Sequence, residues 1–168
     1  MKTENSIIEI FTAFRRLNKA TTVYINKMLA PYEVTVGSYS YLLALLDNGP
    51  MTLTQISKYL VVDNTLTTRV VSHLVKQKYL VRKKNFKNKK TVIISLTDQG
   101  MDVAQAAKNV LSRLNEIAMS GSLPEEAATI QSVLNFVAGN CEEHVWDSAV
   151  FEFEQECLCS NKNKLYEA

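Results

Sequence analysis

Apolar residues recur every three or four positions over much of this 168-residue chain, which is the spacing of helices that bury one face. The pattern predicts a long first helix over residues 5–29, ended by Pro31, and a second helix over residues 38–46, ended by Asn48-Gly49-Pro50. Gly and Pro are scarce, with 5 and 3 residues, which favours long helices over a turn-rich β sandwich.

Two shorter helices are predicted in the middle of the chain. Thr52 and Gln55 have the spacing of a capping box, which predicts a short helix ending at Leu60. Asp63 is a good N-cap for a fourth helix over residues 64–77.

A strand–loop–strand unit follows these helices. Residues 79–81 and 92–96 are β-type runs, and six of the nine residues at 82–90 are basic while none is acidic. A basic loop between two paired strands projects like a finger, and its natural counter-ion is a polyanion.

Two more long helices are predicted at the C-terminal end. Thr97 is the expected N-cap of a fifth helix, which ends near Gly121. Ser122 and Glu125 have capping-box spacing at the start of a sixth helix, with Pro124 tolerated in its first turn.

Charge is distributed unevenly along the chain, although the net charge is only +2. Residues 51–97 carry ten Lys and Arg and one acid, a net charge of +9, whereas residues 121–168 carry nine acids and two Lys, a net charge of −7. The first segment is suited to meet a polyanion and the second is not.

Composition excludes several classes of protein. An apolar content of 46% and a charged content of 21% are globular values, which suit one domain or one compact core with helical extensions. The sequence has no apolar run of membrane-spanning length and no signal-peptide pattern, so we expect a cytoplasmic protein. It has no Gly-rich phosphate loop, no histidine pair at metal spacing and no nucleophile–base pair, so we expect no enzyme, metal or cofactor.

The cysteines fall late in the chain, at Cys141, Cys157 and Cys159. Their odd number indicates free thiols in a cytoplasmic protein. A structural or incidental role is favoured over a metal site, and a thiol switch stays open.

The predicted fourth helix has one polar face without an acid. Val70, Val71 and Leu74 share one side of it, together with Thr67. The opposite side collects Thr65, Thr68, Arg69, Ser72 and Lys76. Arg can bond guanine O6 and N7, and hydroxyls can bond phosphates or base edges, so this face suits a DNA groove. The alternative is an ordinary solvent-exposed face.

The order of these features resembles the MarR family of winged-helix regulators over residues 7–145. The motifs that carry the resemblance are Thr35-Val36-Gly37-Ser38-Tyr39, Gly49-Pro50-Met51-Thr52-Leu53-Thr54-Gln55-Ile56-Ser57, Thr68-Arg69-Val70-Val71-Ser72-His73-Leu74, Arg82 and Leu96-Thr97-Asp98-Gln99-Gly100.

The resemblance implies a mainly α fold with a small β hairpin (α+β), a winged helix-turn-helix with long N- and C-terminal dimerisation helices. It implies a homodimer, a recognition helix at 64–77 in the major groove, and a wing at 83–91 on the minor groove or phosphates. The corresponding divisions are a dimerisation helix at 1–34, a DNA-binding domain at 35–97, and C-terminal dimerisation helices with a tail at 98–168.

The function implied is a repressor that binds an inverted-repeat operator in double-stranded DNA. The alternative is a winged-helix protein-interaction module without DNA binding. The candidate DNA-binding residues are Thr54, Asn64, Thr65, Thr68, Arg69, Ser72, His73, Lys76, Arg82, Lys84, Lys87, Lys89 and Lys90.

The chain departs from the family pattern at several positions. Asn88-Lys89-Lys90 stands where the family usually has Asp-Arg-Arg, and lysine lacks the flat fork of arginine. Lys78 stands at a position that is often Gly and that requires a positive φ if the pattern holds. Leu66 stands where a small polar residue is common; it either contacts a thymine methyl or packs against the neighbouring helix, and packing is slightly favoured.

Many family members respond to a small aromatic or lipophilic effector. By resemblance, Arg16, Tyr39 and Tyr41 border an effector pocket here. The alternative for the tyrosines, favoured for each one, is a place in the core or at the dimer interface.

Overall fold

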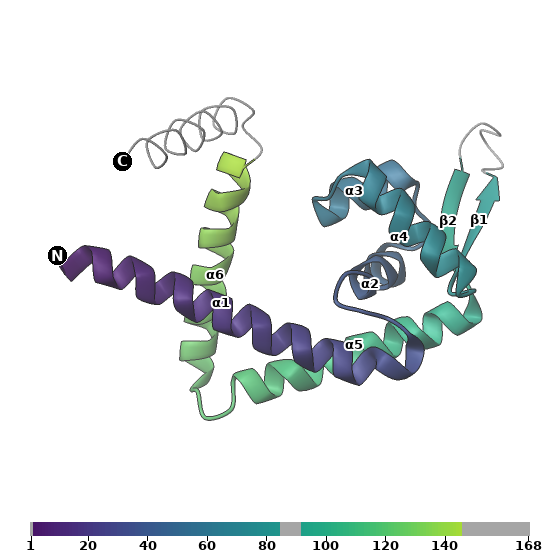
Figure 1. The fold of residues 1–168 in the computed structure, drawn as a ribbon. Helices are drawn as coiled ribbons and strands as arrows, with labels where there is room; N and C mark the ends of the chain where they lie inside the picture. Colours follow the sequence, from purple (N-terminus) through teal and green to yellow (C-terminus); the bar gives the residue numbers. More distant parts are fainter. Residues whose placement is uncertain (1, 85–91, 146–168) are drawn as a thin grey trace, which may run out of the picture. The chain divides into compact units, whose positions relative to one another are not determined.

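The computed structural model describes the backbone of residues 2–84 and 92–145 and divides the chain into two units, Met1–Ala118 and Met119–Ala168 (Figure 1). The first unit contains α1 (Lys2–Leu29), the 3-10 helix η1 (Ala30–Tyr32), α2 (Tyr39–Asn48), α3 (Leu53–Leu60), α4 (Asn64–Lys76), β1 (Leu80–Lys84), β2 (Val92–Leu96) and α5 (Asp98–Ala118). The second contains α6 (Pro124–Val145). No helix in the described ranges is long and apolar enough to cross a membrane. The expected fold, mainly helical with one β hairpin, is confirmed.

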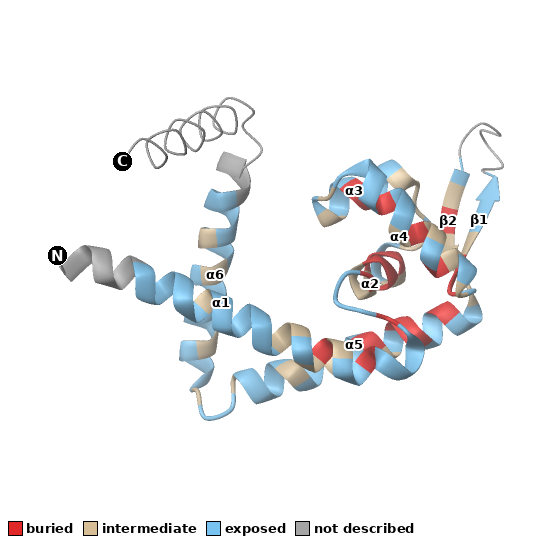
Figure 2. Ribbon diagram, viewed as in Figure 1, coloured by how far each residue is buried: buried red, intermediate tan, exposed pale blue. Residues whose placement is uncertain are grey.

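The core of the first unit is centred on α2. Leu42 of α2, Ile56 of α3, Leu74 of α4 and Ile94 of β2 are fully buried in one cluster. Figure 2 shows the positions coloured as buried on α2 and on parts of α3, α4 and α5. This core holds the helix pair α3–α4 against the hairpin, and therefore fixes the surface that these elements present to solvent.

The hairpin is anchored at its base. β1 and β2 pair in antiparallel register from Leu80 opposite Leu96 to Lys84 opposite Val92. Met51 and Ile94 exchange two backbone hydrogen bonds, of 3.0 and 2.7 Å, which tie β2 to the segment before α3. The first strand extends further than the β-type run predicted, because β1 includes the basic residues up to Lys84.

The caps predicted for the central helices are confirmed. Thr52 and Gln55 form both bonds of the capping box at the start of α3, and the Asp63 carboxylate accepts from Leu66 N–H at 2.7 Å at the start of α4. Thr97 Oγ1 accepts from Gly100 N–H at 2.9 Å at the start of α5. These bonds satisfy backbone donors that the first turn of each helix leaves free.

The cap predicted for α6 is wrong. The helix begins at Pro124, and the Glu126 carboxylate accepts from Leu123 N–H at 2.8 Å. Ser122 Oγ instead donates to Met119 O at 2.6 Å. Proline is favoured at the first helical position, so the N-cap is Leu123 rather than Ser122, and the carboxylate that reaches back is one residue later than predicted.

The junction between the hairpin and α5 requires a glycine. Thr97 N–H donates to Tyr79 O at 3.0 Å, and Thr97 Oγ1 donates to Lys78 O at 2.7 Å. A Cβ on Gly100 would lie 2.0 Å from Tyr79 O, so any larger residue would separate these segments. The Thr97-Asp98-Gln99-Gly100 motif thus connects the turn after α4 to the start of α5.

Three non-glycine residues have positive φ within the described ranges, and all three close helices. Glu33, Val61 and Lys78 have φ of 54°, 54° and 65°. In each case the next residue's N–H reaches back five positions: Val34 to Leu29 O, Val62 to Ser57 O and Tyr79 to Leu74 O. This is the bonding pattern of Schellman C-caps. The expectation that Lys78 occupies a positive-φ position is therefore confirmed.

Candidate nucleic-acid interface

The polar face predicted for the fourth helix forms a shallow groove on the surface of α4. The groove is open to solvent and has a volume of about 470 Å³. It is lined by Asn64, Thr65, Thr68, Arg69 and Ser72. No carboxylate lines it, so its only formal charge is the Arg69 guanidinium. Such a groove offers hydrogen bonds and one positive charge to an anionic or polar ligand.

Two of the hydroxyls in the groove already use their protons. Thr68 Oγ1 donates to Asn64 O at 2.8 Å, and Ser72 Oγ donates to Thr68 O at 2.6 Å. A carbonyl oxygen can only accept, so the hydroxyl must be the donor in each bond. Toward a ligand these oxygens act as acceptors, while Arg69 acts as a donor.

Arg82 links the hairpin to α4. Its Nη2 donates to Ser72 Oγ at 2.7 Å, so the guanidinium of β1 is held against the middle of the helix. Ser72 in turn donates to the α4 backbone, which makes a short chain of bonds from β1 to α4. The arrangement fixes the angle between the strand and the helix at the edge of the groove.

The start of α4 is held by α3. Buried Ser57 places its Oγ 2.8 Å from Asn64 Oδ1 and 3.0 Å from Thr54 O. Asp63 caps the same turn through Leu66 N–H. Ser57 could not be singled out from the sequence, because its partner Asn64 is seven positions away across the turn between two helices.

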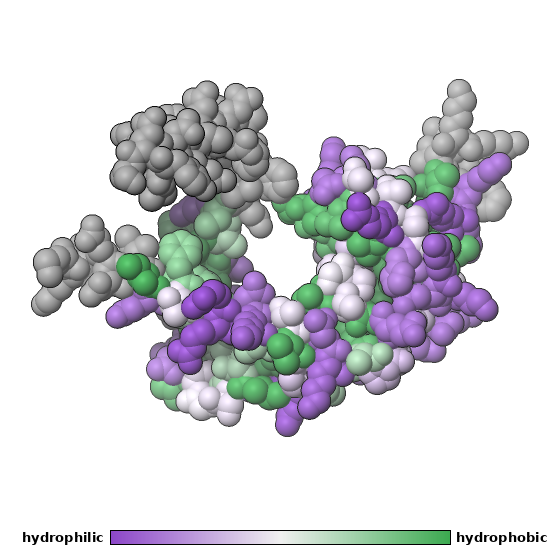
Figure 3. All heavy atoms as spheres, viewed as in Figure 1, coloured by the Kyte–Doolittle hydropathy of each residue, from purple (hydrophilic) through white to green (hydrophobic). Residues whose placement is uncertain are grey.

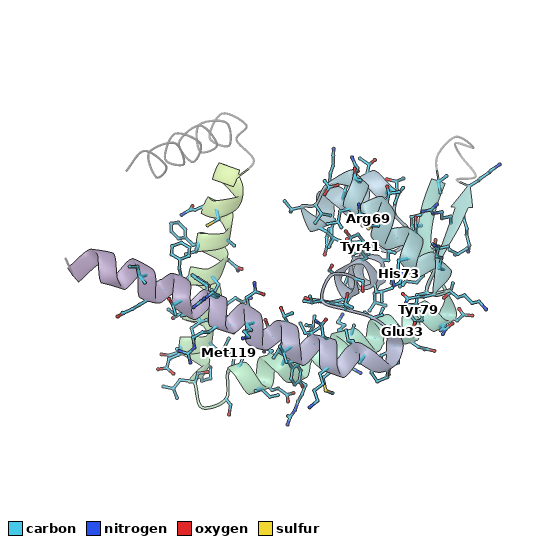
Figure 4. All side chains as sticks on the ribbon, viewed as in Figure 1. Glu33, Tyr41, Arg69, His73, Tyr79 and Met119 are labelled. Carbon is cyan, nitrogen blue, oxygen red and sulfur yellow. The ribbon has the colours of Figure 1, made fainter. Side chains whose placement is uncertain are left out.

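Cationic and polar residues surround the groove. Lys76 and His73 are exposed on α4, Thr54 is exposed on α3, and Lys83 and Lys84 are exposed on β1. Figure 3 shows hydrophilic side chains over the α4 and hairpin side of the first unit, and Figure 4 shows Arg69 and His73 on α4. Such a surface can neutralise phosphates on either side of a central reading groove.

Comparisons with known proteins agree with this geometry. The model of the MarR family matches residues 34–92, which include α2, α3, α4 and β1. The regulator BilQ of Clostridioides difficile is 32% identical over 97 residues, which are 58% of this chain and 66%, just under two thirds, of that protein. The chain belongs to the MarR family. Its relatives BilQ and YybA of Bacillus subtilis are named as HTH-type transcriptional regulators, not as enzymes.

Solved MarR-family structures have the same fold. A mutant of Escherichia coli MarR in complex with operator DNA superposes with a TM-score of 0.70 at 23% identity, covering 79% of this chain and 96% of that one. PcaV of Streptomyces coelicolor, solved with its natural ligand, gives 0.67 at 23% identity, covering 76% and 89%. At these identities the likeness establishes the winged-helix fold.

The structure brings only part of the predicted DNA-binding set together. Asn64, Thr65, Thr68, Arg69 and Ser72 meet in the groove, while the other described residues lie around it or, like Arg82, bond to it. Lys87, Lys89 and Lys90 lie outside the described residues, as do Asn88, Cys157 and Cys159.

Leu66 lies at the surface of α4 and is 40% exposed. The side of α4 that packs in the core is formed by Thr67, Val71 and Leu74, which are fully buried. The MarR-family helix of this chain therefore presents an apolar side chain beside its polar groove.

The residues proposed for an effector pocket occupy different environments. Arg16 is exposed on α1, Tyr39 is half-buried on α2, and Tyr41 is buried in the core. Burial raises the pKa of the Tyr39 hydroxyl above its usual value. The Tyr41 hydroxyl is buried and has no hydrogen-bond partner among the described residues. Across the described ranges, no group of three or more His, Cys, Asp and Glu is arranged to hold a metal.

Proposed function

We propose that this chain is a dimeric MarR-type repressor that binds an inverted-repeat operator in double-stranded DNA. The observation that carries the proposal is the acid-free groove on α4, with Arg69 as its one charged residue. An α-helix fits the major groove of B-DNA, where a guanidinium can bond guanine O6 and N7 together. E. coli MarR, which shares this fold, is solved with operator DNA.

Each group in the interface has a distinct role in this proposal. Arg69 and Thr65 read base edges, and the oxygens of Thr68 and Ser72 accept from adenine or cytosine amino groups. Phosphate charge is neutralised by Lys76 and Lys84 together with Lys87, Lys89 and Lys90 of the wing, while Thr54 and His73 donate hydrogen bonds to phosphates. Arg82 acts by holding β1 against α4 through Ser72.

The dimer in this proposal is formed by the terminal helices. Phe11 on α1 is 65% exposed and Phe136 on α6 is 70% exposed, and other large apolar residues accompany each. A second copy of the chain would bury these side chains. Two-fold symmetry then places two copies of α4 in successive major grooves, about one helical turn apart.

Release from DNA by a small aromatic or lipophilic effector is the least direct part of the proposal. Its support is the Tyr41 hydroxyl, which is buried and has no partner among the described residues, with half-buried Tyr39 two positions earlier on α2 and Arg16 as the cationic candidate on α1. PcaV, which shares the fold, is solved with its natural ligand. A polar group left unsatisfied in a core is a cost that a ligand could remove.

The decisive experiment is DNA binding by the purified chain. Duplexes selected from a random pool and scrambled duplexes of the same composition are titrated at low and moderate salt. Wild type should prefer the selected duplexes, and Arg69→Ala should lose that preference by about 1–3 kcal/mol per half-site. Arg113→Ala, which removes an exposed arginine of α5, is the matched control and should bind as wild type does.

Two results would contradict the proposal. If no duplex binds even at low salt, the winged helix is a protein-interaction module instead. If Arg69→Ala weakens selected and scrambled DNA equally, Arg69 contacts only phosphate and the groove does not read sequence.

A further inference from the structure

Leu66 is exposed at the one part of the protein that the proposed function brings closest to DNA bases. It lies in the first turn of α4, where its N–H donates to the Asp63 carboxylate at 2.7 Å, so the cap fixes the backbone that carries it. Val71 and Leu74 of the same helix are fully buried, whereas Leu66 is 40% exposed. It is the one large apolar side chain classed as exposed on α4.

The position of Leu66 borders the reading groove. Residues three apart on a helix are surface neighbours, so Leu66 lies beside Arg69, and Thr65 precedes it in the same turn. Both of those neighbours line the groove. In helix-turn-helix proteins the N-terminal residues of the recognition helix approach base edges, which is where Leu66 stands.

Only one base offers an apolar partner there. Thymine presents its 5-methyl group in the major groove, whereas the other bases present hydrogen-bond donors and acceptors. A leucine placed against those groups would displace their water molecules without replacing the hydrogen bonds. An isolated exposed leucine elsewhere on a surface needs no explanation. Leu66 differs because it adjoins the single guanidinium of the groove on a capped, rigid turn.

We propose that Leu66 reads the 5-methyl group of a thymine that lies within two base pairs of the base bound by Arg69. This inference rests on the DNA binding proposed above and specifies part of its sequence preference. Removing the methyl group should weaken binding about fourfold per half-site, the value of one apolar carbon returned to water.

The test replaces thymine by deoxyuridine, which lacks only the 5-methyl group. Duplexes are first selected with the full-length protein from a random pool, and each thymine of the consensus is then replaced singly and in symmetric pairs. Wild type should lose about fourfold in affinity at one thymine of each half-site and little at the others. The sensitive thymine should adjoin the guanine at which Arg69→Ala removes discrimination.

Two variants assign the effect to Leu66. Leu66→Met keeps an apolar side chain of similar volume and should retain the sensitivity to uridine. Leu66→Ala should bind the thymine and uridine duplexes equally. Thermal unfolding checks that both variants fold, and a wild-type scan in which no uridine duplex binds more weakly overturns the proposal whichever variants fold.

The possible failures are distinguishable. If wild type binds every uridine duplex as tightly as the thymine duplex, or if Leu66→Ala is as sensitive as wild type, Leu66 does not read the methyl group while DNA binding stands. If no duplex is bound at low salt, the proposed function fails and the Leu66 inference fails with it.

Discussion

Lys78 follows the end of α4 by two residues and has a conformation that suits glycine. Its φ is 65°, its N–H bonds Val75 O, and its carbonyl accepts from Thr97 Oγ1. The left-handed conformation costs a residue with a Cβ roughly 1–2 kcal/mol. Local bonding on both sides holds Lys78 there, so the cost is retained in the folded state.

We expect Lys78→Gly to stabilise the protein. Relief of the left-handed strain should exceed the added entropy of the unfolded chain, giving a gain of about 0.5–1 kcal/mol. Chemical denaturation at one fixed protein concentration measures the free energy of unfolding. Lys76→Gly is the control, because it also removes a lysine side chain but at the last residue of α4, where φ is not positive. Its free energy of unfolding should fall by about 1 kcal/mol. A loss of stability in Lys78→Gly would show that the lysine side chain stabilises the turn.

The same residues show what local sequence can predict. The caps by Thr52, Asp63 and Thr97 and the positive φ of Lys78 were predictable because each depends on neighbours within five positions. The Ser122 cap was wrong because Pro124 moved the helix start by one residue.

At the scale of elements, the buried core holds α4 against the hairpin, and Arg82 adds an exposed hydrogen bond to Ser72 between them. This bond was not predictable, since it joins two residues whose distance depends on how β1 packs against α4. The sequence placed Arg82 among residues that touch DNA. In the structure one guanidinium nitrogen of Arg82 bonds Ser72 Oγ, and we propose that Arg82 positions the helix through this bond.

The salt dependence of DNA binding separates these two roles. A lysine that neutralises a phosphate contributes about 0.9 to the slope of log affinity against log salt concentration. Lys84→Gln, at the exposed end of β1, should therefore flatten the slope by about that amount per half-site. Arg82→Gln should leave the slope unchanged and lower the preference for selected over scrambled duplexes, because the helix loses its support.

Titration of each variant at several salt concentrations gives both quantities. A flatter slope in Arg82→Gln would mean that Arg82 leaves Ser72 to contact a phosphate. An unchanged preference would mean that the bond to Ser72 does not orient α4.

At the scale of the whole molecule, the proposed dimer depends on the exposed apolar residues of α1 and α6. Phe11 is 65% exposed and its ring centroid lies 6.5 Å from that of Phe14. Periodicity predicted these apolar faces from the sequence but left open whether they pack within one chain or between two. In the structure they are exposed, and the proposed dimer would bury them.

We expect Phe11→Asp to separate the dimer. Two symmetric phenylalanines would each lose about 2 kcal/mol of burial, and each would be replaced by a charge, so the dimer Kd should rise by about 10³-fold or more. Sedimentation equilibrium measures this change directly. Binding to the complete inverted repeat should then fall toward that of a single half-site, because the second α4 no longer binds from the same particle.

Met101→Asp, which places the same charge at another exposed apolar position on α5, should remain dimeric and bind the full operator. If Phe11→Asp stays dimeric and binds the operator as wild type does, the interface lies elsewhere. If it stays dimeric but loses operator affinity, α1 affects α4 without forming the interface.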